Sequence, residues 1–172
     1  MKKEVQLGII YAVLAVFFFS TSPLFIRWAA PLSAYEIATG RLGTAAIAIF
    51  LLILLRRERY HIPREGWPRF MLFGLIAALH FIFYIASLMY TTIAHALAIV
   101  YTAPIFVTLF SAWFLHESMP RHKWIGIGVT IGGIALLVKF QPHFDQRMLF
   151  GDLLALGSAI MFGFYSIAGR SQ

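Results

Sequence analysis

The chain contains six apolar segments, each long enough to cross a bilayer as an α-helix. Crossing about 30 Å of hydrocarbon takes about 20 helical residues, because each adds about 1.5 Å. The predicted spans are Leu7–Trp28, Ala34–Leu55, Phe70–Thr91, Ile93–Leu115, His122–Lys139 and Leu149–Gly169. Within lipid, a segment of this kind must satisfy its own backbone hydrogen bonds. We therefore predict an all-α fold, a polytopic transmembrane bundle of about six helices.

The composition favours lipid as the main solvent of this chain. Hydrophobic residues make up 60% of the sequence and charged residues only 12%, whereas soluble domains carry about 25% charged residues. The net charge of +7 does not indicate a nucleic-acid partner, because most charges lie in short gaps between apolar runs. The chain has no cysteine, which excludes disulfides and thiolate metal sites. The expected partners are the lipid bilayer and no nucleic acid.

The placement of lysine and arginine predicts the orientation. With a cytoplasmic N-terminus, the inner side holds Lys2, Lys3, Arg56, Arg57, Arg59, Arg64, Arg69, Arg121, Lys123 and Arg170, which leaves Arg27, Arg41, Lys139 and Arg147. The first apolar run continues too far for a cleaved signal peptide, so we expect it to be retained as a helix. Both termini of this chain are predicted to be cytoplasmic.

A weak internal repeat relates the first and last segments. A common offset pairs Gly8 with Gly151, Ala12 with Ala155, Phe19 with Phe162 and Arg27 with Arg170. The offset spans five helices, an odd number, so a second copy would insert upside down, as in inverted-repeat transporters. We expect residues 1–140 to form one five-helix unit and residues 141–172 to begin an incomplete second one.

Three stretches resemble the drug/metabolite transporter superfamily, specifically its EamA-type domain. The first is AHALAIVYTAPIFVTLFSAWFLHESMPRHKWIGIGVTIGGIALLV, residues 94–138, with a mid-helix proline (Pro104), an acidic helix end (Glu117) and a glycine-rich helix. The second is TGRLGTAAIAIFLLILL, with Arg41 early in its helix, and the third is GDLLALGSAIMFGFYSIAGR. The family usually has ten helices in two such units, and this sequence supplies one unit plus one helix.

The resemblance implies a carrier that moves small metabolites, often outward, through a central cavity between two units. Its partners would be a small-molecule substrate and either the missing second repeat or a second copy of the chain. We expect amino-acid-like or other small organic solutes, movement by alternating access and a location in the bacterial cytoplasmic (inner) membrane.

A polar stripe on the third segment supplies the first cavity candidates. His80, Tyr84, Ser87 and Thr91 follow a spacing that places them on one helix face. Polar groups at membrane depth face the bundle interior or a water-filled cavity. The alternative is that these side chains only join helices by hydrogen bonds. His80 is the predicted proton-coupling residue, because histidine changes charge near neutral pH.

Prolines mark two further candidate positions. Tyr101, Pro104 and Thr108 share a face of the fourth segment, and Pro104 would free the carbonyl of Val100. Pro23 would do the same in the first segment. We predict helix kinks at both prolines, either structural or at a binding site, since transporters often bind substrate at broken helices. Ser158 and Tyr165 of the last segment complete the predicted cavity lining.

Charged residues near helix ends have predicted roles in structure or binding. Arg41 must reach the interface, a carbonyl or an acid, and a substrate carboxylate is one possible counter-ion. Ion pairs that hold helix ends together are expected between Arg27 and Glu36 and between Glu117 and Arg121.

The glycines of the fifth segment form a small-xxx-small pattern. Gly128 and Gly132 would let another helix approach closely, either within this chain or from a second copy.

No catalytic, cofactor or metal motif is present in the sequence. We therefore expect no enzyme, no cofactor and no metal site. A complete six-helix channel or a small dimeric carrier is the alternative to a half-transporter. An intramembrane enzyme is the remote alternative, because its nearest nucleophile and base, Ser87 and His80, lie about 10 Å apart along the helix axis.

Overall fold

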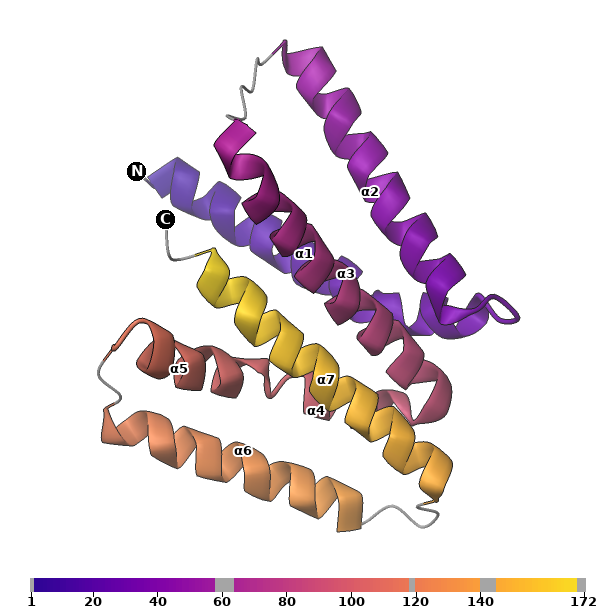
Figure 1. Ribbon diagram of the computed structural model, residues 1–172, viewed down its shortest axis with the longest axis vertical. Helices are drawn as coiled ribbons and strands as arrows, with labels where there is room; N and C mark the ends of the chain where they lie inside the picture. Colours follow the sequence, from indigo (N-terminus) through magenta and orange to yellow (C-terminus); the bar gives the residue numbers. More distant parts are fainter. Residues whose placement is uncertain (1, 58–63, 118–119, 140–144, 170–172) are drawn as a thin grey trace.

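A computed structural model of the chain describes residues 2–57, 64–117, 120–139 and 145–169. These residues form seven α-helices and one short 3-10 helix, with no strand among them (Figure 1). The helices are α1 (Lys2–Trp28), α2 (Ala34–Arg56), α3 (Trp67–Tyr90), α4 (Ile93–Val100), α5 (Ala103–Phe114), α6 (Arg121–Lys139) and α7 (Gln146–Ala168); the 3-10 helix η1 is Arg64–Gly66. The predicted all-α helix bundle is confirmed.

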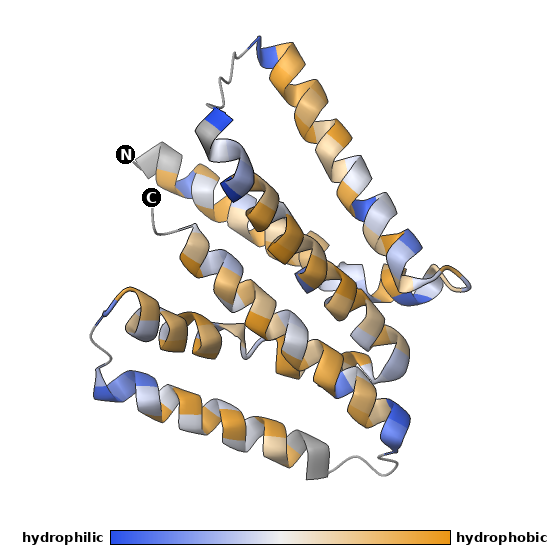
Figure 2. Ribbon diagram, in the orientation of Figure 1, coloured by the Kyte–Doolittle hydropathy of each residue, from blue (hydrophilic) through white to orange (hydrophobic). Residues whose placement is uncertain are grey.

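Five segments in the described ranges have the length and apolar composition of a membrane span. They are Val5–Trp28, Ala34–Arg56, Trp67–Tyr90, Ile93–Phe114 and Gln146–Ala168. The remaining long helix, α6, has Arg121 and Lys123 in its first turn and is not among the five. Its crossing stays a prediction. Figure 2 shows apolar helix bodies with hydrophilic residues gathered toward helix ends, as expected of an integral membrane protein.

The last helix of the chain lies between helices that precede it. α7 packs against α3 on one side and against α4 and α5 on the other, while α1 and α2 contact α3 (Figure 1). α6 lies beyond α5, at the outer side of the bundle. Segments far apart in the sequence therefore meet along α7.

Small residues on α7 permit this close packing. A Cβ atom added at Gly151 would lie 2.7 Å from the backbone nitrogen of Thr91, and one at Gly163 would lie 2.8 Å from Cβ of Phe106. Gly128 and Gly132 of α6 differ, because an added Cβ meets nothing within 4 Å. Within the described ranges their added Cβ atoms would thus enter open space, and the packing role predicted for them stays a prediction.

Local capping sequences explain where several helices begin. Ser33 and Glu36 form a capping box at the start of α2, in which each side chain accepts the other residue's backbone N–H. Thr92 caps α4, and Asp145 caps α7 by accepting the backbone N–H of Met148 at 2.8 Å. These polar residues satisfy amide groups that helix starts leave unpaired.

The fourth predicted span is broken into two helices at Tyr101 and Thr102. Pro104 was expected to kink a continuous helix, and the structure corrects this: it lies in the first turn of α5. At that position its missing N–H breaks no helical hydrogen bond. Pro23, in contrast, lies inside α1, which continues past it to Trp28.

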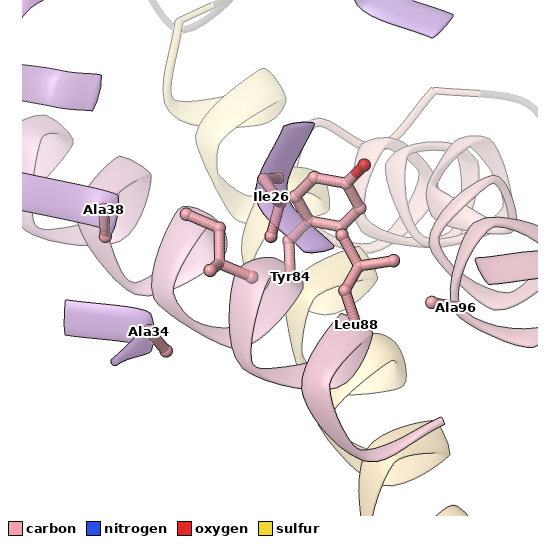
Figure 3. Packing of buried hydrophobic residues seen from close by; sticks show 7 residues of the cluster. Ile26, Ala34, Ala38, Tyr84, Leu88 and Ala96 are labelled. Carbon is pink, nitrogen blue, oxygen red and sulfur yellow. The ribbon is translucent and has the colours of Figure 1, made fainter. Parts of the chain in front are cut away.

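A small apolar cluster joins α3 to the ends of α1 and α2 and to α4. Figure 3 shows Tyr84 and Leu88 of α3 close to Ile26, and Ala34, Ala38 and Ala96 belong to the same cluster. The outer faces of α1 and α2 are open, as the 74% exposure of Trp28 and the 81% exposure of Leu55 indicate. These apolar faces suit contact with lipid or with further helices.

Candidate functional site

A pocket of about 240 Å³ lies where α4 gives way to α5. Four parts of the bundle contribute its walls: α1, α3, the α4–α5 segment and α7. The lining residues are Phe19, His80, Phe81, Tyr84, Leu97, Val100, Tyr101, Ala103, Pro104 and Phe162. The structure thus brings four of the predicted cavity residues together, namely His80, Tyr84, Tyr101 and Pro104.

The helix break explains why a pocket forms at this position. α4 ends at Val100, and Tyr101 and Thr102 connect it to α5 without continuing the helix. The Thr102 hydroxyl donates to the Ile99 carbonyl at 2.6 Å, which satisfies one acceptor at the break. Because broken helices leave backbone groups without helical partners, such breaks are tolerated beside protein or a cavity.

His80 joins the pocket wall to α7. Its Nδ1 lies 2.9 Å from the carbonyl oxygen of Ser158 and 2.9 Å from the Ser158 hydroxyl. Since a carbonyl only accepts, the first contact places a proton on Nδ1. The Ser158 hydroxyl donates to the His80 carbonyl at 3.1 Å. Ser158 is fully buried, so it acts here as a contact between helices rather than as pocket surface.

Tyr84 and Arg41 add polar groups near an otherwise aromatic pocket. The Tyr84 hydroxyl is buried and has no hydrogen-bond partner in the described part of the chain. Arg41 donates to the Ser22 hydroxyl at 2.7 Å, and its guanidinium carbon lies 5.2 Å from the ring centre of Phe81, a pocket residue. Among the described residues, the partners of Arg41 are therefore a hydroxyl and an aromatic face, rather than an acid or a carbonyl.

Four other predicted residues lie outside this pocket's lining. The Ser87 hydroxyl donates to the Tyr84 carbonyl and the Thr108 hydroxyl to the Pro104 carbonyl, so both bond within their own helix. Tyr165 is 45% exposed and contacts the Phe73 ring. Thr91, at the end of α3, contacts α7.

The predicted pairing of Arg27 with Glu36 is not seen, because each side chain has another partner. Arg27 donates to the carbonyls of Leu88 and Thr91 at the end of α3, while Glu36 accepts from Ser33. Carbonyls at a helix end lack helical partners and attract a cation. Glu117 and Arg121 lie on either side of residues 118–119, and their pairing stays a prediction.

Sequence reasoning missed a buried polar cluster of Thr91, His95 and Asp152. The Thr91 hydroxyl donates to Oδ1 of Asp152 at 2.7 Å, and Nδ1 of His95 lies 3.0 Å from Oδ2 of the same carboxylate. A signal was available, since Asp152 is an acid inside an apolar segment, and such residues usually mark function.

Comparison with known proteins relates this chain to membrane transporters. The sequence model of the EamA-like transporter family matches residues 6–139. The pseudopaline exporter CntI of Pseudomonas aeruginosa (strain UCBPP-PA14) is 33% identical over 136 residues, which cover 78% of this chain and 47% of the exporter. The uncharacterized transporter YoaV of Bacillus subtilis (strain 168) is 27% identical, over 77% of this chain and 46% of YoaV.

More distant similarities follow the same pattern. Mouse solute carrier family 35 member G1 is 26% identical, over 77% of this chain and 36% of that protein. One solved crystal structure superposes on this chain with a TM-score of 0.55 and 24% sequence identity. The superposition covers 92% of this chain and 56% of the other. The chain spans about half the length of the curated bacterial relatives it matches.

Proposed function

The chain belongs to the EamA-like transporter family, and from this premise we propose that it forms part of a carrier for small organic solutes. The pocket at the α4–α5 break carries the proposal. Its walls come from four separate parts of the bundle, so relative movement of helices would change its shape. In the proposed cycle the pocket opens alternately to the two sides of the bacterial inner membrane, with both termini of this chain cytoplasmic and net movement outward.

The chemistry of the pocket favours a solute with an apolar or aromatic body and a carboxylate. Phe19, Phe81 and Phe162 supply aromatic surface, against which a ring packs well. Arg41 lies against the Phe81 ring and holds only a neutral hydroxyl among its described contacts. A carboxylate would give this guanidinium a bidentate partner. The Tyr84 hydroxyl, which has no partner among the described residues, would supply a further hydrogen bond.

The proposed carrier needs a second wall for its cavity. The matched part of the chain covers about half of each bacterial relative, and the exposed apolar faces of α1 and α2 are suited to further helices. We propose that a second inverted unit, or a second copy of this chain, completes the cavity.

The decisive experiment is counterflow of matched probes into liposomes that contain the intact protein. Phenylpyruvate, phenylalanine and phenethylamine share a benzyl body. Phenylpyruvate carries a carboxylate, phenethylamine carries an ammonium, and phenylalanine carries both groups. A carrier with this pocket should accelerate counterflow of the two carboxylates and not of the amine. Tyr84→Phe and His80→Ala should each reduce the rate by about tenfold, the loss of about one hydrogen bond to a charged group.

Matched variants outside the pocket control for general damage. Tyr35→Phe removes a hydroxyl from the exposed start of α2, and His122→Ala removes an exposed imidazole from α6. Both should retain the rate of the unmodified protein. Equal rates in the pocket variants and these controls would refute the cavity assignment, and transport without counterflow would favour a channel.

A further inference from the structure

The cluster of Thr91, His95 and Asp152 lies apart from the proposed pocket and has the features of a binding site. Its three side chains come from the end of α3, from α4 and from α7. His95 is 1% exposed and Asp152 is 9% exposed. An ionisable pair buried this deeply inside candidate spans is expensive unless its members neutralise one another.

The hydrogen bonds restrict where protons can lie in this cluster. Both oxygens of Asp152 are engaged, one by the Thr91 hydroxyl and one by Nδ1 of His95. With Asp152 ionised, its carboxylate only accepts, and Nδ1 of His95 then carries the proton of this hydrogen bond. The opposite nitrogen, Nε2, is then a lone-pair acceptor while the ring is neutral. It is buried and has no hydrogen-bond partner in the described part of the chain.

An unpartnered polar atom at this depth calls for a physical reason, because nearly all buried polar groups are paired. A neutral His95 leaves the carboxylate as a net negative charge. A proton added at Nε2 makes an imidazolium beside that carboxylate and brings the pair to neutrality. On the basis of the transport function proposed above, we infer that His95 Nε2 is a proton-binding site. Binding of a proton there changes the solute pocket by displacing α4.

Charged side chains on the helices around the cluster come from three elements. From α1, Arg27 donates to the Thr91 carbonyl. From the start of α7, Arg147 donates to the Met89 carbonyl at 3.3 Å and Asp145 caps its own helix. On α2, Glu36 is bound by Ser33 and Arg41 by Ser22. Each of these charged side chains therefore has a described partner other than the His95 and Asp152 side chains, whereas Nδ1 of His95 bonds to Asp152 within the cluster.

The side of the cluster that faces α6 is apolar and hollow. Asp152 lines a second cavity, of about 590 Å³, between α4–α5, α6 and α7. The residues that α6 contributes to it are Trp124, Ile127, Ile131 and Ile134. None of them titrates, so this side adds space beside the carboxylate and no competing charge. Water that enters this cavity would supply the proton.

Helix α4 connects the proton site to the pocket. It is only 8 residues long, begins at the Thr92 cap and ends at the break at Tyr101. His95 and Ile99 are buried on one of its sides, while Leu97 and Val100 line the pocket. A change in the bond between His95 and Asp152 therefore displaces a segment that forms part of the pocket wall.

His80 is the rival for this role, since it also carries an imidazole and lines the pocket itself. Its described partner is Ser158, which contributes a carbonyl and a hydroxyl. The carboxylate of Asp152 gives His95 a negatively charged partner that stabilises the protonated ring, whereas the described partner of His80 is the neutral Ser158. The two histidines can be separated by mutation.

The first test observes the proton directly, independently of any solute. The intact protein, labelled with ¹⁵N-histidine in lipid nanodiscs, is titrated from about pH 5 to about pH 8, where histidine changes charge. His95→Asn identifies the signal, because asparagine keeps a donor near the Nδ1 position and has no atom at Nε2. We expect the His95 signal to change from neutral ring to imidazolium. A signal that stays neutral over the whole range overturns the proposal.

The second test measures coupling to the pocket with phenylpyruvate as the probe. In the unmodified protein its Kd should change about tenfold across the same pH range, a typical coupling between two sites. His95→Asn should bind the probe with less than about twofold change, whereas His122→Asn, on the exposed start of α6, should keep the full response. A response that survives in His95→Asn and disappears in His80→Ala overturns the coupling role of His95.

The two tests separate this proposal from the proposed function. Absence of phenylpyruvate binding at every pH would refute the solute class, while the NMR titration would still decide the proton site. Should His95→Asn fold poorly, Asp152→Asn removes the negative charge and keeps an acceptor of similar shape. It should then suppress imidazolium formation, and an unchanged His95 titration in that variant would overturn the proposal.

Discussion

Helices α2 and α7 have the same length, 23 residues, and both qualify as membrane spans. Only 6% of the α2 span is buried inside the structure, compared with 39% of the α7 span. The presence of glycine does not by itself explain this difference in burial, because both helices contain glycines. An added Cβ at Gly40 or Gly43 of α2 meets nothing within 4 Å, whereas one at Gly151 or Gly163 of α7 meets a neighbour below 3 Å.

α7 also contributes more polar side chains than α2 to hydrogen bonds with other helices. α7 contributes Asp152 and Ser158 to bonds with other helices, and α2 contributes Arg41. Apolar surface gives little preference for protein over lipid, so small residues and hydrogen bonds decide which helix becomes central. The comparison teaches that an apolar span is buried in the bundle only where its small and polar residues meet complementary partners.

The largest expected effect comes from adding bulk at the buried glycines. Gly163→Leu should destabilise the intact protein by about 3 kcal/mol, because overpacking forces α7 away from Phe106. Gly43→Leu, the matched change on α2, should cost almost nothing. Unfolding in a titration with denaturing detergent measures both. A similar loss in the two variants would show that α2 also packs closely against another helix.

A smaller effect is expected from the arginine that binds the end of α3. Arg27→Met should cost about 2 kcal/mol, because two carbonyls lose a charged hydrogen-bond donor. Arg41→Met on α2 loses one bond to a hydroxyl and should cost about half as much. The same unfolding titration compares them, and the reverse order would contradict the contacts described above.

Removal of the helix caps should cost about 1 kcal/mol at either helix. Asp145→Ala uncaps α7, and Ser33→Ala uncaps α2. We expect the loss at α7 to lower the global stability, since its neighbours depend on it. The loss at α2 should appear as faster amide hydrogen exchange confined to its first turn. Exchange that accelerates throughout the bundle in Ser33→Ala would contradict this division.

The smallest effect concerns single hydroxyls. Ser158→Ala removes a bond between α7 and α3 and should cost about 0.6 kcal/mol, the average for such bonds in membranes. Thr44→Val on α2 should be close to neutral, because the Thr44 hydroxyl bonds only within its own helix. Thermal unfolding curves of the two variants check the order. A larger loss for Thr44→Val would indicate a partner for that face of α2.

The sequence by itself determined the helices and much of their ends. The first span was predicted to end at Trp28 and the second to begin at Ala34, and the structure agrees with both. Helix length, caps and apolar periodicity are local properties, so a single segment reveals them. The face of α3 that carries His80 and Tyr84 follows from the same periodicity.

The tertiary structure alone decided which of these faces meet. Asp152 lies 57 residues from His95 and 61 residues from Thr91 in the chain, and no local pattern relates them. The break before Pro104 also depends on its surroundings, because proline is compatible with a kink as well as with a helix start. In lipid almost every helix face is apolar, so the sequence pattern that reveals a helix does not reveal its neighbours.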